Sequence, residues 1–258
     1  MSPVDRRLTH MPEPAAHVKR RRADGLSMAW ATIDDVVGIC VFGSVARGDA
    51  SERSDIDMIV LSTNSDLTSQ ELLDMALESK RHGDISVRVY TSEDLVDHLT
   101  RSPIFAAHLK SDGIILLDRN NQLSAIINRD YPISISDEIN WQRKNVELYE
   151  HSERFGHALL LPLARLYSIG RAVVFLRLFQ QAVIEFNATR AFAKLGDLRP
   201  EWRNSLAEVG QLRPFFQSVR LDDIGAEWPF DPFGDDARER FESARGAVHT
   251  LLTDSCDV

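Results

Sequence analysis

The chain has 258 residues, 43% hydrophobic and 27% charged, with a net charge of −9 and a pI near 5.4. This composition is typical of a globular protein with one large or two modest domains, and it argues against a protein that coats duplex DNA through positive charge. Two cysteines are too few for a disulfide framework, and no apolar run approaches the roughly 20 residues of a membrane span. Because no charged-then-apolar leader opens the sequence, we expect a cytoplasmic protein without a membrane partner.

The first third of the chain predicts an arm, a helix and two strands. Residues 1–14 contain three prolines and predict a loose arm. Residues 15–36 suit a helix with a basic turn, which is expected to be a solvated face. Ile39–Phe42 predicts a short buried strand, and Asp55–Leu61, in which carboxylates alternate with apolar residues, predicts a second one.

The next segment alternates helical and extended patterns. Residues 69–81 carry an amphipathic helical pattern, and residues 84–90 alternate apolar and polar side chains as a strand does. Thr91–Leu99 opens with a capping residue followed by acidic residues and predicts a helix. A further helix over 104–109 and a last strand over 113–118 complete this part.

After Asp118 the composition changes to helical patterns alone. We expect a linking helix over 119–129, a helix capped by Ser136, a helix with three-four spacing from Leu159, two helices ended by Gly196 and Gly210, and a last helix over 235–252. The aromatic turn-rich stretch 228–234 is expected to pack on this bundle. The predicted organisation is therefore an arm at 1–14, a first domain at 15–118 and a helical bundle domain at 119–258.

Two short motifs predict a chemical site. Asp55 and Asp57 are two residues apart on a predicted strand, so their side chains project from the same face. Two ionised carboxylates so near each other repel, and either a cation or a proton must offset their charge. Mg²⁺ prefers one or two carboxylates together with substrate phosphates. Gly43 and Ser44 follow the first strand, where a glycine lets a phosphate approach the backbone and a serine adds a donor. Together these residues predict a site for nucleoside triphosphate chemistry.

The pattern Gly43-Ser44-x-x-Arg47-Gly48 followed by Ser54-Asp55-x-Asp57 resembles the signature of the DNA polymerase β-like nucleotidyltransferase superfamily. It is most similar to the branch that includes antitoxin-type and aminoglycoside nucleotidyltransferases. The motif covers about twenty residues and the resemblance extends to Asp118. It implies an α/β (α+β) nucleotidyltransferase fold with a mixed sheet, followed here by a C-terminal all-α helical bundle.

The resemblance also implies an activity. A nucleoside monophosphate would pass from a nucleoside triphosphate, by resemblance ATP, to a hydroxyl of a protein, an aminoglycoside-like small molecule or an RNA end. Asp55 and Asp57 would hold one or two Mg²⁺ ions, and Gly43 and Ser44 would cradle the outer phosphates. Two interpretations of Arg47 remain open: a side chain that neutralises phosphate, or one exposed just past the turn.

The third strand departs from the superfamily pattern. The family usually places a third carboxylate there, whereas this alignment puts Ser86, or even Arg88, at that position. Asp84 has the right parity but lies one strand repeat earlier, so it is either the third acid or a strand-start residue. If the acid is missing, the alternative function is a catalytically weakened nucleotide-binding antitoxin or regulatory protein that acts through its bundle. Arg177 has two interpretations as well, a triphosphate contact or a snorkelling edge arginine.

Overall fold

The computed structural model describes residues 14–52, 54–63, 85–150, 152–156, 158–221 and 227–253. The chain divides into two compact units, Met1–Asp130 and Tyr131–Val258. Residues 1–13 of the expected arm, the helix expected over 69–81 and Asp84 lie outside the described residues. Within the described ranges, no helix combines the length and the apolar character that a membrane span needs.

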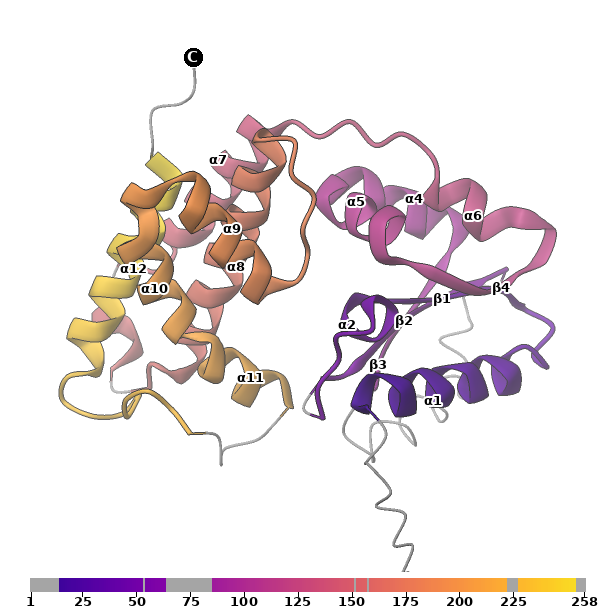
Figure 1. The fold of residues 1–258 in the computed structure, drawn as a ribbon, viewed down its shortest axis with the longest axis horizontal. Coiled ribbons are helices and arrows are strands. Elements are labelled where there is room, and N and C mark those ends of the chain that lie inside the picture. Colours follow the sequence, from indigo (N-terminus) through magenta and orange to yellow (C-terminus); the bar gives the residue numbers. More distant parts are fainter. Residues whose placement is uncertain are drawn as a thin grey trace, which may run out of the picture. The chain divides into compact units, whose positions relative to one another are not determined.

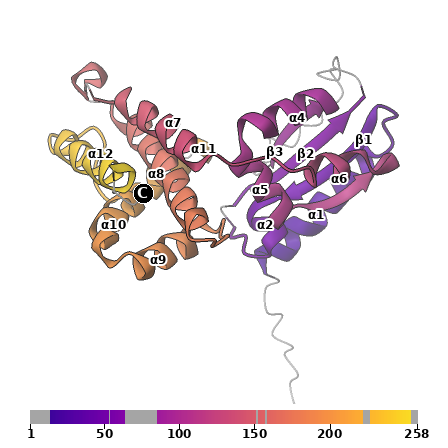
Figure 2. The ribbon, with the colours of Figure 1, turned by 90° about the horizontal axis from the view of Figure 1, so that it is seen from above.

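The described part of the first unit is a four-stranded mixed sheet with helices on both faces (Figures 1 and 2). The strand order is β3-β2-β1-β4, with β2 parallel to β3 and β1 antiparallel to both of its neighbours. This confirms the expected mixed sheet. In chain order the elements are α1 (Ala15–Trp30), β1 (Val36–Phe42), α2 (Gly43–Arg47), β2 (Ile56–Ser62), β3 (Ile85–Thr91), α4 (Ser92–Arg101), α5 (Pro103–Asp112), β4 (Ile114–Asp118), the 3₁₀ turn η2 (Arg119–Asn121) and α6 (Gln122–Ile127).

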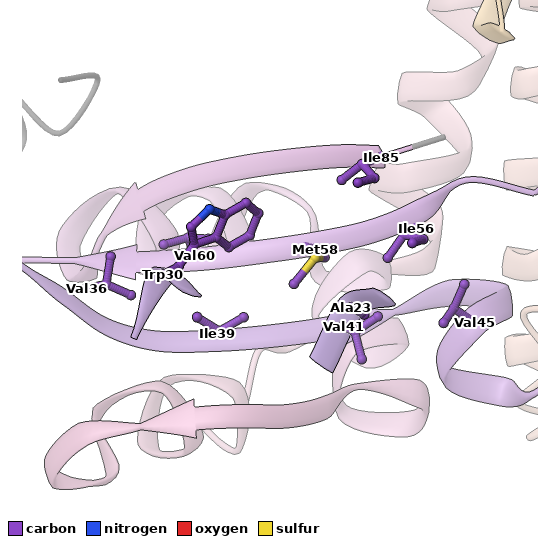
Figure 3. Close-up of a cluster of buried hydrophobic side chains, with 10 residues drawn as sticks. All are labelled: Ala23, Trp30, Val36, Ile39, Val41, Val45, Ile56, Met58, Val60 and Ile85. Atoms are coloured by element: carbon purple, nitrogen blue, oxygen red, sulfur yellow. The ribbon is translucent and has the colours of Figure 1, made fainter. Parts of the chain in front are cut away.

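One face of the sheet buries its apolar side chains against α1. Trp30 of α1, Val41 of β1 and Met58 of β2 are fully buried there, within the cluster drawn in Figure 3. Each fully buried side chain of this size stabilises the fold by about 1.5–3 kcal/mol relative to exposure.

The prediction that the first helix reaches residue 36 was wrong, because the chain turns after Trp30 and Val36 already begins β1. The β-branched residues of this segment favour the strand.

The opposite face is covered by α4, α5 and α6 (Figure 2). Phe42 at the end of β1 meets the ring of Phe105 edge-on, with 5.4 Å between ring centroids. Farther along this face, Tyr90 of β3 stacks on His98 of α4 at 5.3 Å. Cys40 is fully buried, as expected of a small core residue, and this burial raises the pKa of its thiol to about 12. These contacts hold α4 and α5 on the sheet.

The division between the units falls after Asp130, later than the boundary at Asp118 drawn from the sequence. The reason is local. The carboxylate of Asp118 accepts hydrogen bonds from the backbone N–H groups of Leu123, at 2.8 Å, and Ser124, at 3.1 Å. This capping holds α6 at the end of β4, and α6 packs on β1 and β4. Side-chain capping therefore joins α6 to the sheet unit.

The described part of the second unit is entirely helical, in agreement with the predicted bundle. Its long helix α8 is apolar on most sides and contacts α7, α9, α10, α11 and α12, which is the pattern of a central buried helix. In chain order the elements are α7 (Ile135–Glu147), the 3₁₀ turn η3 (Ser152–Phe155), α8 (Leu160–Gln180), α9 (Ala188–Leu198), the 3₁₀ turn η4 (Pro200–Trp202), α10 (Arg203–Gln211), α11 (Arg213–Leu221) and α12 (Ala237–Thr253).

Several predicted helix ends in this unit were wrong. The cap of α7 is Ser134, whose hydroxyl accepts the N–H of Asp137, and not Ser136. Gly196 lies inside α9 and Gly210 lies inside α10 instead of ending those helices. A glycine is tolerated inside a helix at a cost of about 1 kcal/mol relative to alanine, so it is a weak stop signal.

The stretch 228–234 packs on the bundle, as predicted. The indole N–H of Trp228 donates to the hydroxyl of Ser218 at 2.9 Å, and the rings of Phe230 and Phe215 lie 4.9 Å apart. Both partners belong to α11, a helix that the sequence analysis did not predict. The half-buried Trp228 and Phe230 therefore cover the fully buried ring of Phe215.

Arg177 lies in the core of the bundle, and neither interpretation from the sequence describes it. Its side chain is only 3% exposed. The guanidinium donates to the carbonyl oxygens of Leu251, at 3.0 Å, and Leu252, at 3.1 Å. These carbonyls belong to the last turn of α12, where intrahelical donors have run out. Arg177 is thus a capping residue that ties α8 to the C-terminal end of α12.

Candidate active site

The site is organised by the turn that joins β1 to α2. Gly43 has a φ of 73°, and Gly48, which ends α2, has a φ of 77°. Both values lie in the left-handed region that only glycine adopts without strain. Between them the five-residue α2 leaves Ser44 partly exposed while Gly43 is buried. The backbone of this turn is therefore fixed by two glycines at defined positions.

Asp57 lies directly against this turn. A Cβ atom added to Gly43 would be 2.9 Å from Oδ2 of Asp57 and 3.7 Å from its Cγ. The sheet register explains the approach, because Asp57 of β2 pairs with Phe42, the residue before Gly43. Its neighbours Ile56 and Met58 are fully buried in the α1 core. Since side chains alternate along a strand, Asp57 projects from the other face, beside the turn.

Asp55 immediately precedes β2 and is partly exposed, like Asp57. Ile56 between them is fully buried, which supports the prediction that the two carboxylates project away from the core together. Their oxygen atoms are hard ligands that suit Mg²⁺. Among the described residues, no group of three or more His, Cys, Asp or Glu side chains is placed to hold a metal ion. The described part of the site therefore offers a carboxylate pair.

The neighbouring strand presents a serine at this level. Ser86 of β3 pairs with Asp57, and Arg88 pairs with Ile59. Paired residues on adjacent strands share a face, so Ser86 stands beside Asp57 and Arg88 lies two residues farther along that face. These are the two positions at which the resemblance implies an acid. Asp84 lies outside the described residues, and its role as third acid stays a prediction.

Arg47 is held in an ionic cluster. Its guanidinium lies 2.7 Å from Oδ2 of Asp112 and 3.3 Å from Oδ2 of Asp49, while its Nη1 is 3.3 Å from Nε2 of His108. Because Asp112 and His108 belong to α5, this cluster ties α2 to α5. Two carboxylates balance the charge of Arg47, and its contact with a phosphate remains a prediction.

Asp112 is the most perturbed acid of this cluster. Burial alone would raise the pKa of its carboxyl, but hydrogen bonds from His108, Arg47 and Ser111 outweigh that effect and lower the pKa to about 2. Sequence reasoning missed both Asp112 and His108. The available signal was their i,i+4 spacing on one helix, which places the two side chains 3.2 Å apart.

Lys19 of α1 is a second residue that sequence reasoning missed. Its side chain is buried to 7% exposure, although it belongs to the basic cluster expected to be solvated. Its ammonium group donates to the backbone carbonyl of Ser54, one residue before Asp55. Lys19 therefore anchors the loop that leads into the carboxylate-bearing strand. Nothing in a local basic pattern distinguishes this buried lysine from its exposed neighbours.

Part of the chain matches a known protein family. Residues 29–122 match the family model described as polymerase beta, nucleotidyltransferase. Residues 29–122 are thus similar to a polymerase β-type nucleotidyltransferase domain. This match confirms the resemblance drawn from the two motifs, and it spans the sheet unit from the end of α1 to the start of α6. No curated protein is similar enough to the chain to match it.

Two solved structures resemble the chain in fold. The spectinomycin adenyltransferase AAD(9) from Enterococcus faecialis, solved with ATP and spectinomycin, is 11% identical with a TM-score of 0.53, over 90% of this chain and 99% of that one. At this identity the likeness shows the fold alone, in both the sheet unit and the helical unit. A nucleotidyltransferase-like protein from Exiguobacterium sibiricum is 12% identical with a TM-score of 0.32, over 90% of this chain and 74% of that one.

Proposed function

We propose that the chain is a Mg²⁺-dependent nucleotidyltransferase that moves a nucleoside monophosphate from ATP to a hydroxyl of an acceptor molecule. The observation that carries the proposal is the contact between the turn at Gly43 and the carboxylate of Asp57. A phosphate that approaches the glycine-serine backbone would lie beside that carboxylate. This is the juxtaposition that nucleotide transfer needs, and we place the reaction in the cytoplasm, where nucleoside triphosphates are available.

The donor set fits magnesium. Asp55 and Asp57 supply hard oxygen ligands, and an ion of this kind usually keeps waters and substrate phosphates as its remaining ligands. Gly43 has no side chain to cover Oδ2 of Asp57, since any Cβ would press on it. Magnesium, when bound by these two residues, would offset negative charge that develops around the α-phosphate.

The other residues of the site would bind the phosphates and hold the site in position. The N–H groups of the turn and the hydroxyl of Ser44 would bind the outer phosphates. Arg47 and Asp112 keep α2 in place against α5. An acceptor hydroxyl then attacks the α-phosphorus and gives its proton to Asp84, the candidate third acid, or to water, while the bond to the pyrophosphate breaks and the monophosphate stays on the acceptor. Lys19 keeps the loop before Asp55 in place, which fixes the geometry of attack.

The acceptor belongs to one of three classes: a small molecule, a protein or an RNA end. The similar adenyltransferase from Enterococcus faecialis was solved with ATP and spectinomycin, so ATP and spectinomycin are the first pair to test. The acidic pI near 5.4 favours a cationic small molecule over a nucleic acid. A protein acceptor and an RNA acceptor would be tested next in the same assay.

The direct experiment replaces the two carboxylates. The double variant Asp55→Asn plus Asp57→Asn is expected to lose Mg²⁺-dependent transfer from radiolabelled ATP while its circular dichroism spectrum and thermal midpoint stay close to those of the wild type. The matched control is Asp34→Asn plus Asp97→Asn, because both of these aspartates are exposed. Transfer that survives in the first variant would rule out the assignment.

The alternative function is a nucleotide-binding antitoxin or regulatory protein with weakened catalysis. It is favoured by Ser86, which pairs with Asp57 at the level where an acid is expected. Loss of a general base typically costs roughly 10²–10⁴ in rate. Titration of ATP with and without Mg²⁺, paired with a pyrophosphate-release assay, separates the two functions. Binding without turnover over all three acceptor classes would favour the regulatory protein.

A substitution at Ser86 sharpens this distinction. If the third acid is absent, Ser86→Asp should raise the rate of transfer. If Asp84 supplies it, Ser86→Asp should leave the rate unchanged or lower it, and Asp84→Asn should reduce the rate by roughly 10²-fold or more.

A further inference from the structure

The helical unit contains a cavity of about 470 Å³ that is lined by residues of α8, α9, α10 and α11. This volume falls in the range of small-molecule sites, roughly 300–1,000 Å³. Small residues from α9 and α10 make the room, and two aromatic rings form part of the wall. The small residues are Ala188, Ala193, Gly196, Ala207 and Gly210, and the rings are Tyr167 and Phe192. Room alone does not indicate a ligand, so the polar groups of the wall decide its chemistry.

Tyr167 of α8 is the first of these polar groups. It is only 3% exposed, and its ring is held by Phe192, at a centroid distance of 6.3 Å, and Phe216, at 5.3 Å. Within the described ranges its hydroxyl has no hydrogen-bond partner from the protein, and the side chain lines the cavity. The hydroxyl oxygen itself is accessible although the ring is buried, and such a hydroxyl takes its hydrogen bonds from water or a ligand. The hydroxyl is therefore placed to donate to something inside the cavity.

The charge around that hydroxyl is positive. Arg213 of α11 lines the same cavity and donates to the hydroxyl of Thr189 at 2.7 Å. The guanidinium of Arg171 lies over the rings of Phe216, at 4.9 Å, and Tyr167, at 5.8 Å. Burial raises the pKa of Tyr167, an effect that the two arginines oppose only in part. The hydroxyl therefore stays protonated at neutral pH and acts as a donor.

The carboxylate that lines the cavity does not cancel this charge. Asp197 is largely exposed and lies 3.7 Å from the guanidinium of Arg203. The cavity as a whole thus has a flat aromatic wall, a floor of small residues, and a cluster of a hydroxyl donor and an arginine. A planar ring fits the wall, and a carboxylate fits the donors, since arginine binds carboxylates through two parallel hydrogen bonds.

We propose that this cavity is a binding site for a planar aromatic small molecule that carries one carboxylate. The ring lies against Phe192 and the small residues of α9 and α10. The carboxylate accepts hydrogen bonds from the hydroxyl of Tyr167 and the guanidinium of Arg213. All of these residues belong to the helical unit, and none of them takes part in the proposed transfer chemistry. The binding proposal can therefore be tested independently of the enzymatic function.

The test is isothermal titration calorimetry on the full chain with naphthalene-2-carboxylate as the probe. Naphthalene-2-carboxamide has the same shape without the charge and should bind roughly tenfold more weakly. Arg213→Gln should weaken binding of the carboxylate by roughly tenfold, and Tyr167→Phe by roughly three- to tenfold. The matched controls Arg220→Gln, on the same helix, and Tyr149→Phe should leave the affinity unchanged.

A cavity-filling variant keeps the proposal testable if Tyr167→Phe or Arg213→Gln disturbs the fold. Ala207 is exposed at its position on α10, so Ala207→Trp should fold normally and abolish binding of the probe. Three results would overturn the proposal: no binding heat at millimolar probe, equal affinity for the carboxylate and the carboxamide, or undiminished binding to the Ala207→Trp variant.

Discussion

Gly43→Ala is the perturbation that examines the site most directly. Gly43 has a φ of 73°, where an L-residue costs roughly 1–2 kcal/mol. The new Cβ would also lie 2.9 Å from Oδ2 of Asp57, whereas ordinary contact begins at 3.4 Å. The carboxylate must therefore retreat by roughly 0.5 Å, or the turn must move by a similar amount. A misplacement of about 1 Å at a reacting centre can cost roughly 10²-fold in rate.

Gly48→Ala provides a matched control. Gly48 has a φ of 77°, so an alanine there has a similar conformational cost. No heavy atom lies within 4 Å of the Cβ that would be added. The two variants should therefore lose similar stability, about 1–2 kcal/mol each, which corresponds to a few degrees in the thermal midpoint. Only Gly43→Ala should displace Asp57.

The assay is Mg²⁺-dependent nucleotide transfer, measured beside urea denaturation of each variant. We expect a loss of roughly 10–10²-fold in kcat/KM for Gly43→Ala and a loss of less than about threefold for Gly48→Ala, at equal folded fraction. Equal losses in the two variants would show that backbone strain alone explains the effect. Full activity in Gly43→Ala would refute the contact between the turn and the carboxylate as the centre of the site.

Three further predictions concern residues that stabilise the inside of one unit or the other. Asp112 has a pKa of about 2 in the fold against an ordinary 3.8, so its ionised carboxylate stabilises the fold by about 1–2 kcal/mol after solvent screening. This stabilisation is complete above about pH 4 and is lost as the pH falls toward about 2. In urea denaturation the difference in unfolding free energy between wild type and Asp112→Asn should shrink over that range, and a constant difference would contradict the pairing with Arg47. Lys19→Met keeps the apolar stem but loses the bond to the Ser54 carbonyl, and transfer should fall by roughly tenfold with less than about 2 kcal/mol of lost stability; unchanged transfer would contradict its anchoring role. Arg177→Met leaves the last carbonyls of α12 without their donor and should cost about 3 kcal/mol in urea denaturation, a value that a mere surface arginine would not approach.

The local pattern was sufficient to predict the elements of the sheet. The strands around Val41 and Met58 were found from β-branched runs and from alternation with period two, because each strand buries at least one face completely. The helix ends were harder. Gly196 and Gly210 looked like stop signals and proved to be interior residues, since tertiary packing outweighs a propensity difference of about 1 kcal/mol.

Partners that lie far apart in the sequence could not be predicted in the same way. Arg47 meets Asp112 from α5, and Lys19 meets the carbonyl of Ser54. No spacing rule joins such residues, because each contact depends on how a helix packs across the sheet. The local spacing likewise predicts an edge residue or a phosphate ligand at Arg177, because its two carbonyl partners on α12 are 74 and 75 residues away in the sequence.

The sequence by itself determined which residues are candidates for the site: two carboxylates at strand spacing and a glycine-serine turn are local features, and local features follow from the chain alone. The tertiary structure decided that Gly43 rests against Asp57, that Ser86 stands beside that acid, and that Tyr167 and Arg213 share a cavity. These facts depend on register and on helix packing. Both are set by the burial of many side chains together, so no single stretch of the sequence contains them.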